Sequence, residues 1–198
     1  MKFLSKVLAL VLSYLVILMI VDSCKACKTY NYDIDKMSLK NLIYSYGTFT
    51  PNTKETDTTV LKYSQFGIRI KFHDIIYSNI KRSYSLINTA MAYDCWDQYN
   101  IQHEVDNISI ISLNNFDLNH TANTDISEYF RASFYPNQVS TIDSTINYEN
   151  KDSFSRFDYF DLLLNKAPQL DSLFRFVVKV KLSNNELVDT TEIIKLLK

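Results

Sequence analysis

The sequence predicts a mainly β protein, namely an antiparallel, immunoglobulin-like β-sandwich with one or two short helices. Two segments carry this prediction, residues 66–72 and 174–182, in which apolar residues alternate with polar ones. Strict alternation places one face of a strand in the core and the other face in water. Strands that are wet on one face are typical of antiparallel sheets and argue against a parallel α/β sheet.

The mature chain is expected to begin with a tether. Residues 25–38 are polar and predict a linker into the first strand, which we place at residues 39–49 because Leu42, Ile43 and Tyr44 lie within it. Residues 51–59 are rich in Thr, Asn, Asp and Glu, a composition typical of a loop.

The middle of the chain contains the clearest strands. Residues 66–72 form one, and residues 74–77 extend it with further apolar side chains. Residues 83–93 fit another strand or a short helix. Residues 105–113 predict a strand whose even-numbered members, from Ile108, face one way and whose odd-numbered members face the other.

A less regular region follows this strand. Residues 114–120 have the composition of a turn. Asp125 is a good N-cap with Glu128 three residues later, so residues 126–132 predict a short helical turn. Residues 136–149 are expected to be irregular.

The last quarter of the chain predicts a helix and a hairpin. Residues 157–164 fit a helix that ends before Pro168. Residues 174–182 alternate clearly, the polar residues 183–185 make a turn, and residues 187–197 return as the closing strand.

The amino terminus resembles an export signal. Lys2 and Lys6 give a short positive segment, and residues 7–21 are apolar apart from a serine and a tyrosine. An apolar run of this length fits a signal peptide, whereas a membrane-spanning helix needs about 20 apolar residues. We therefore expect residues 1–23 to be a signal peptide.

The cysteine after this segment resembles the lipidated residue of a bacterial lipobox. Val21 and Ser23 fit that pattern before Cys24, whereas Asp22 occupies a position that usually holds a small uncharged residue. Cys24 is thus the predicted lipidation site. Residues 24–38 would be a lipid-anchored tether to a domain over residues 39–198. The alternative is an uncleaved membrane anchor, and both place the domain outside the cytoplasm, with the lipid form on the outer membrane of the envelope.

Two further cysteines remain once Cys24 carries a lipid. Cys27 and Cys95 are then the available thiols, and an oxidising compartment permits one disulfide between them. The alternative is that both stay as free thiols.

Charge and glycine content exclude several classes of ligand. Without Lys2, Lys6 and Asp22, the 21 basic and 22 acidic residues become 19 and 21, a net charge of −2. This balance gives no basic stripe for nucleic acid. The two glycines, Gly47 and Gly67, are too far apart for a phosphate-binding loop, and no cofactor is expected.

Histidines and carboxylates provide weak candidates for chemistry. No glycine-flanked serine elbow is present, and no histidine pair has HExxH spacing. His103 with Glu104 and Asp106, or Asp117 with His120, are mixed ligand sets for a metal, although solvated loop side chains are the simpler interpretation.

A pair of carboxylates is the signature of a glycosidase, provided that the two flank a cleft. The chain offers several in its later part, but the sequence does not bring any two of them together. The candidates are Asp143, Asp152, Asp158 and Asp161.

Aromatic residues are the most distinctive part of the composition, at 14% of the chain. Exposed Tyr and Trp supply flat contact area for sugars or proteins, whereas buried ones would simply fill the core. The candidate contact residues are Tyr44, Tyr46, Trp96 and Tyr99, with Tyr30 and Tyr32 nearby in the sequence.

Several segments resemble a family of uncharacterised lipoproteins from Bacteroidetes. The resemblance begins at Cys95-Trp96, runs through residues 108–120 and 124–130, and includes the strand and polar turn of residues 174–187. It implies a β-sandwich lipoprotein that faces the periplasm or the cell surface, and it brings no catalytic residues.

The sequence thus favours a non-enzymatic, lipid-anchored module that binds a protein or glycan partner in the cell envelope. One alternative is an envelope hydrolase with a carboxylate pair. Another is a fimbria-like assembly subunit, because the carboxy-terminal hairpin would present an edge strand.

Overall fold

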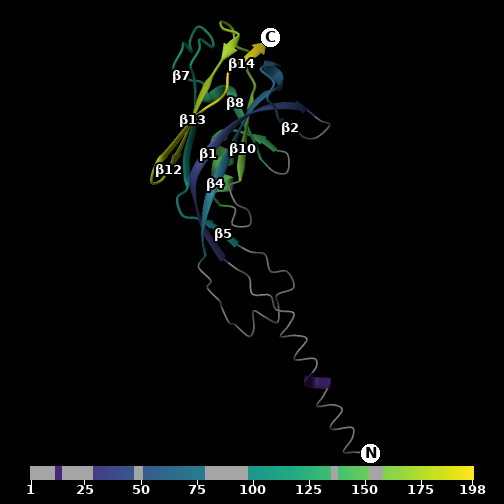
Figure 1. The fold of residues 1–198 in the computed structure, drawn as a ribbon, viewed down its shortest axis with the longest axis vertical. Coiled ribbons are helices and arrows are strands. Elements are labelled where there is room, and N and C mark those ends of the chain that lie inside the picture. The colour runs from purple at the N-terminus through teal and green to yellow at the C-terminus, as the bar shows by residue number, and fades with distance from the viewer. Residues whose placement is uncertain (1–11, 15–28, 47–50, 79–97, 135–137, 152–157) are drawn as a thin grey trace, which may run out of the picture.

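The computed structural model describes residues 12–14, 29–46, 51–78, 98–134, 138–151 and 158–198. Most of them form strands, which are grouped in three sheets of seven, four and three strands (Figure 1). The predicted mainly β, sandwich-like architecture is confirmed. The part of the chain that the structure describes contains no helix that is long and apolar enough to cross a membrane.

The largest sheet has the strand order β2-β1-β4-β10-β8-β9, and β5 pairs with β1 in addition. All its pairings are antiparallel except that of β1 with β5. Its strands are β1 (Thr29–Tyr46), β2 (Pro51–Glu55), β4 (Phe66–Ser78), β5 (Gln98–Ile101), β8 (Phe130–Phe134), β9 (Gln138–Ser140) and β10 (Tyr159–Leu164).

Two smaller sheets complete the fold. The four-stranded sheet has the order β13-β12-β6-β7, with β6 (Val105–Ser112), β7 (Thr124–Asp125), β12 (Phe176–Leu182) and β13 (Glu186–Thr190). The three-stranded sheet has the order β11-β14-β3, with β3 (Val60–Lys62), β11 (Leu173–Phe174) and β14 (Ile194–Leu197), and its β14–β3 pair is parallel.

The core lies between the large sheet and the four-stranded sheet. The ring of Phe176 on β12 stacks on Phe66 of β4 at 5.6 Å and meets Phe130 of β8 edge-on at 5.9 Å. All three side chains are buried. Because the alternating apolar residues of both sheets point inward, this interface holds most of the buried hydrophobic surface.

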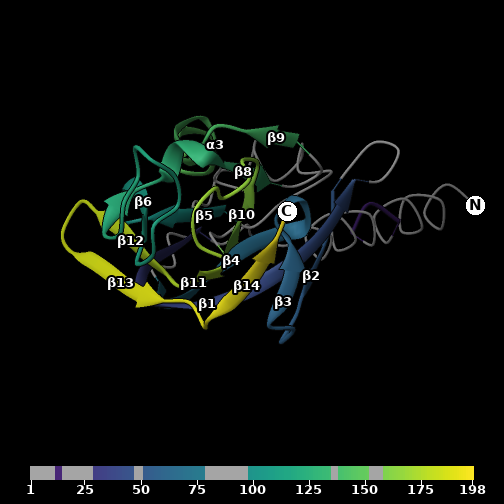
Figure 2. The same cartoon turned by 90° about the horizontal axis from the view of Figure 1, so that it is seen from above.

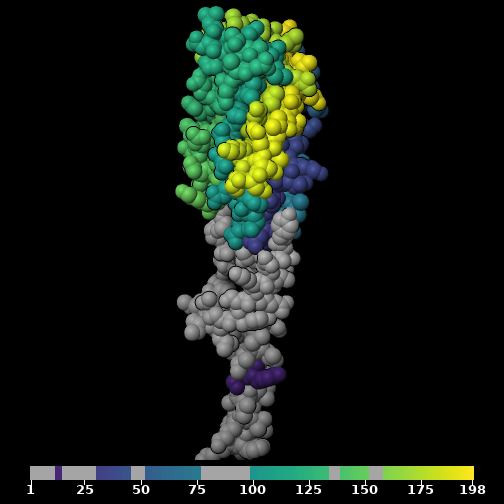
Figure 3. Space-filling view, turned by 90° about the vertical axis from the view of Figure 1, so that its left-hand side faces the viewer, coloured from purple at the N-terminus to yellow at the C-terminus, as the bar shows by residue number. Residues whose placement is uncertain are grey.

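A helix and a strand contact close the two open sides of the sandwich. Helix α3 (Ile142–Glu149) packs against β6 and β8 (Figure 2). Thr141 caps it by accepting a hydrogen bond from the Ser144 amide at 3.2 Å. On the other side β13 lies beside β1, where the Leu39 amide donates to Asp189 Oδ2 at 3.1 Å. Figure 3 shows the yellow carboxy-terminal strands between the teal part of the chain and the blue β1.

The predicted tether is wrong from residue 29 onward. Strand β1 begins at Thr29, and Tyr32 and Ile34 belong to the core. The register shifts between Ile34 and Lys36, which is a bulge in the pairing with β4. The bulge changes the phase of the alternation, so the strand does not show one continuous period of two in the sequence. The predicted strand at residues 39–49 is the later part of β1, up to Tyr46.

The predicted loop at residues 51–59 is also partly wrong, because residues 51–55 form the edge strand β2. Pro51 starts this strand, a position that proline tolerates, and the polar composition suits an edge that faces water. The extension of the 66–72 strand is confirmed, since β4 runs to Ser78. Residues 83–93 lie outside the described residues.

The helix predicted at residues 157–164 is wrong, because residues 159–164 form strand β10 between β4 and β8. Five consecutive residues of this strand are buried, so both of its faces are covered. A strand buried on both faces lacks the alternation of a half-exposed strand, and the apolar residues on either side of Asp161 are not distinguished from a helix by periodicity.

Two further local predictions need correction. Residues 136–149 are not irregular, because they contain β9 and α3. Residues 126–132 hold a short 3-10 helix at Ser127–Tyr129, but β8 begins directly after it at Phe130. The predictions for β6 and for the β12–β13 hairpin are confirmed, with Val180 opposite Leu187, although residues 194–197 join the third sheet instead of continuing the hairpin.

Candidate functional site

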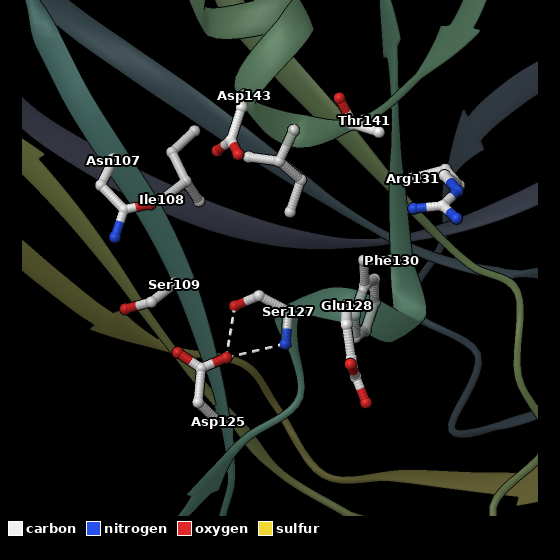
Figure 4. Close-up of a pocket in the computed structure, with 11 residues that line it drawn as sticks. Asn107, Ile108, Ser109, Asp125, Ser127, Glu128, Phe130, Arg131, Thr141 and Asp143 are labelled. Atoms are coloured by element: carbon white, nitrogen blue, oxygen red, sulfur yellow. Dashed lines mark hydrogen bonds between the residues drawn. The ribbon is translucent and has the colours of Figure 1, made fainter.

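A groove opens on the side of the sandwich that carries α3. It has a volume of about 280 Å³ and lies between β6 of one sheet and β8 of the other (Figure 4). It is lined by Asn107, Ile108, Ser109, Asp125, Ser127, Glu128, Phe130, Arg131, Thr141, Ile142 and Asp143.

The groove exists because strand pairing stops early on both sides. Strand β7 pairs with β6 only at Ile111 and Ser112. Residues 107–109 of β6 therefore have β12 on one side, and no described strand pairs with them on the other. Similarly, β9 pairs with β8 only from Ala132 to Phe134. The two strand edges leave a gap that α3 covers at one end.

A short chain of hydrogen bonds connects the lining residues Asp125 and Ser127 to strand β6. Asp125 Oδ1 accepts from the amide of Ser127 at 2.8 Å and from its hydroxyl at 2.6 Å (Figure 4). The same Ser127 hydroxyl accepts from the Ile110 amide at 2.8 Å. Asp125 was predicted to cap a helical turn. Its side chain does bond to the first residue of the 3-10 helix, Ser127, although the N-cap position itself is Ile126, which makes no side-chain hydrogen bond.

The groove is negatively charged. Ile108, Phe130 and Ile142 are buried beneath it, and charged side chains stand around them. Three carboxylates and one guanidinium line it, which gives a net charge of −2; they are Asp125, Glu128, Asp143 and Arg131. A concave surface with a net charge attracts ligands of the opposite sign.

A hydrogen-bonded cluster adjoins the groove through Glu128. Asp117 lies at its centre and is nearly inaccessible to solvent. Its Oδ2 accepts from the Tyr129 hydroxyl at 2.9 Å and from Lys166 Nζ at 3.0 Å, and its Oδ1 accepts from His120 Nδ1 at 2.8 Å. His120 Nε2 lies 3.5 Å from Glu128 Oε1, which connects the cluster to the groove.

The cluster keeps Asp117 ionised. Burial raises the pKa of this carboxyl, but hydrogen bonds from His120, Lys166 and Tyr129 outweigh burial and hold the pKa well below its ordinary value. The pKa of Lys166 is raised by its hydrogen bond to Tyr129 and then by Asp117. The pKa of Tyr129 is raised by burial, so the phenol stays protonated and donates to Asp117.

The predicted contact aromatics are not brought together. Tyr44 is buried and its hydroxyl donates to the Leu164 carbonyl at 2.8 Å, so its ring is not available to contact a ligand. Tyr99 stacks on Tyr30 with ring centroids 5.3 Å apart, at the other end of β1. The side chain of Tyr46 and all of Trp96 lie outside the described residues.

The histidine candidates pair with carboxylates of the protein. His103 Nδ1 lies 2.8 Å from Asp33 Oδ2, which links the loop after β5 to β1. Asp117 and His120 do meet, but Lys166 occupies the position beside Asp117 that a cation would take. Within the described ranges, no group of three His, Cys, Asp or Glu side chains is placed to hold a metal ion.

The four carboxylates considered for a glycosidase are not one constellation. Asp143 lines the groove, whereas Asp161 lies on the outer face of the large sheet and forms a bidentate pair with Arg69, with two N–O distances of 2.6 Å. This pair raises the pKa of Arg69. Asp158 is exposed, and Asp152 lies outside the described residues. Cys24, Cys27 and Cys95 also lie outside the described residues.

The comparisons with known proteins place the chain in a family. A model described as Domain of unknown function (DUF5034) matches residues 40–192, which is more than half of the 198 residues. The chain belongs to this family. The DUF5034 match includes the whole groove and the Asp117 cluster. No curated protein and no solved structure matches the chain.

Sequence reasoning missed most of the residues that build this site in the DUF5034 domain. Asn107 and Arg131 come from different strands, and nothing in their local pattern marks them. Tyr129 and Lys166 come 12 and 49 residues after Asp117, with no fixed spacing that would link them to it. The sequence did single out Asp125 as a capping residue, Asp143 among the candidate carboxylates, and Asp117 with His120 as a pair.

Proposed function

We propose that this DUF5034 chain is a lipid-anchored binding module of the bacterial cell envelope, a lipoprotein of the kind found in Bacteroidetes. The observation that carries the proposal is the groove between two strand edges, built into a rigid sandwich. Concave sites on a preformed scaffold are the usual places where proteins bind ligands.

The start of β1 limits how far the domain can lie from Cys24. Thr29, the first residue of this strand, comes five positions after Cys24. At roughly 3.5 Å per residue, the intervening chain spans at most about 17 Å. A lipid on Cys24 would therefore hold the domain close to the membrane, with the beginning of β1 as the proximal end (Figure 1).

The lining of the groove favours a protein partner over a glycan. Sugars are commonly held against exposed aromatic rings. Phe130 is the one aromatic side chain among the residues lining the groove, and it is 1% exposed, so it offers no stacking surface. An open strand edge, in contrast, is suited to peptide recognition.

Capture of partners from the envelope tests the proposal. The mature lipoprotein would be isolated from membranes and its co-purifying proteins identified by mass spectrometry, beside an Asp143→Arg variant that reverses a charge in the groove. Asp57→Arg makes the same change in an exposed loop and is the matched control. We expect partners with the wild type and the control but not with Asp143→Arg. Equal recovery from all three, or an empty eluate, would contradict the proposal.

The anchor has a separate test. A Cys24→Ala protein should leave the membrane fraction or retain its uncleaved signal segment, which an intact mass measurement distinguishes. A Cys24→Ala protein that stays with membranes at the mature mass would show that lipidation does not anchor the chain.

A second candidate function is hydrolysis of an envelope polymer. It is favoured by the presence of Asp125, Glu128 and Asp143 in one groove, since glycosidases use pairs of carboxylates. Release of soluble fragments from purified cell-wall glycan, abolished in Asp143→Asn and Glu128→Gln, would support it. If the purified chain releases nothing, this candidate fails.

A further inference from the structure

We infer that the groove binds a short extended peptide with basic side chains, which adds as a strand to β6 at Ile108. The inference rests on the proposed binding function and specifies the occupant of the same groove. Two independent features lead to it, the direction of the backbone groups of β6 and the charge of the lining.

The hydrogen bonds of β6 show which way its backbone groups point. On the side away from β12, the Ile110 amide donates to Ser127 and its carbonyl accepts from the Ile126 amide at 2.8 Å. The Ser112 carbonyl accepts from Asn123 at 2.7 Å on the same side. Alternate residues of a strand present their N–H and C=O groups to the same side, so those of Ile108 point into the groove.

Nothing in the described part of the chain satisfies Ile108 on this side. Next along the strand, Val105 is already bonded by Asn150, whose side chain accepts from the Val105 amide and donates to its carbonyl at 2.9 Å. The Asn150 side chain thus bonds to the edge of β6 at Val105, and β7 pairs with the same edge at Ile111 and Ser112. No described residue bonds to the Ile108 amide or carbonyl on the groove side.

The bonds already made at Val105 and at Ile110 limit the length of the occupant. The available edge extends over residues 106–109, and a strand rises about 3.3 Å per residue. The edge is therefore about 13 Å long, enough for three or four residues of an extended peptide. Longer partners would have to leave the groove on either side.

The charge of the lining selects basic side chains. Asp143 lies on one side of Ile108, and Asp125 and Glu128 lie on the other (Figure 4). Side chains that alternate from an added strand would pass close to these carboxylates. Arg131 is the single cation of the lining, so an acidic peptide would meet a net repulsion.

Labelled peptides test the inference on the full mature chain in detergent. The probe is the acetylated, amidated peptide Lys-Val-Lys-Val-Lys with a fluorophore, and binding is followed by anisotropy. A Glu-Val-Glu-Val-Glu peptide tests the charge. A basic peptide N-methylated at all five residues tests the strand pairing, because it lacks their backbone N–H donors but keeps the charge.

We expect the basic peptide to bind at least tenfold more tightly than either comparison peptide, and Asp143→Arg but not Asp57→Arg to remove binding. Equal binding of the methylated peptide would overturn strand addition, and equal binding of the acidic peptide would overturn the charge preference. If no peptide binds although envelope partners are still lost with Asp143→Arg, this inference fails and the binding function stands.

Discussion

Asp117 shows how a single residue can hold three loops together. Besides His120, Tyr129 and Lys166, its Oδ1 accepts from the Asn119 amide at 3.0 Å, so both carboxylate oxygens are occupied. Its partners lie in the loop after β6, in the turn before β8 and in the loop after β10. A buried carboxylate that is fully hydrogen-bonded favours one arrangement of the chain around it.

Substitution Asp117→Asn should destabilise the fold. The amide nitrogen of asparagine is a donor and would face donors from Tyr129 and Lys166, or from His120 in the flipped orientation. Leaving such buried groups unsatisfied costs about 1 to 3 kcal/mol. Urea denaturation measures this loss, and Asp57→Asn in an exposed loop is the control. A loss no larger than that of the control would contradict the structural role.

The same carboxyl makes stability depend on pH. Its pKa in the folded protein lies below the ordinary value of 3.8, so the folded state binds its proton less readily than the unfolded state. The contribution is therefore complete above about pH 4 and is lost as the pH falls toward the folded-state pKa. The difference in unfolding free energy between wild type and Asp117→Asn should shrink as the pH falls below about 4.

Gly67 is required for a close approach between strands. A Cβ at this position would lie 2.7 Å from the Leu162 carbonyl oxygen and 3.1 Å from Leu163 Cδ2. Backbone atoms of β10 would have to move, because the carbonyl belongs to the sheet. Gly67→Ala should lower the unfolding free energy by about 1 to 3 kcal/mol, as overpacked cores do. An unchanged urea midpoint would show that the sheet accommodates the methyl group.

At the scale of elements, alternation decides which side chains carry the fold. Strand β14 pairs with β11 and β3 and turns Ile194 and Leu196 into the core, with Lys195 and Leu197 outward. Ile193, directly before the strand, is 58% exposed, whereas Ile194 is fully buried. These two adjacent isoleucines are chemically identical and differ in their environment.

Alanine substitutions at these neighbours should therefore differ sharply. Ile194→Ala removes buried methyl groups and leaves a cavity, at a cost of about 2 to 5 kcal/mol. Ile193→Ala is its matched control and should change the unfolding free energy by less than about 0.5 kcal/mol. Thermal and urea denaturation of both variants check the expectation. Similar losses in the two would mean that β14 is placed with the wrong face inward.

At the scale of the whole molecule, the pairing of β1 with β5 joins two distant parts of the chain at the end where β1 begins. The pair is parallel, with Thr29 beside Gln98. Cys27 precedes Thr29 by two residues and Cys95 precedes Gln98 by three. Both cysteines lie outside the described residues, but chain length alone allows them to approach within the range that a disulfide needs.

We expect Cys27 and Cys95 to form a disulfide in protein taken from the envelope. Alkylation followed by intact mass should add no label before reduction and two labels after it, since the Cys24 thiol would carry the lipid. A Cys27→Ser protein should then carry one label without reduction. Two labels on the wild type before reduction would show that both thiols are free.

The sequence alone determined the fold class and several strands. Alternation is a local property, so β4, β6 and the β12–β13 hairpin were found from the residues themselves. It also gave Asp125 as a capping residue. Strand β10 escaped this reasoning because its neighbours bury both of its faces, and the first part of β1 escaped it because a bulge shifts the phase.

The tertiary structure alone decided the site. The groove depends on where β7 and β9 stop pairing with β6 and β8, and the Asp117 cluster depends on loops that are far apart in the sequence. Pairing of strand edges is non-local, because any strand offers the same N–H and C=O groups whatever its side chains. It therefore became visible which residues share the groove only once the order of the strands was known.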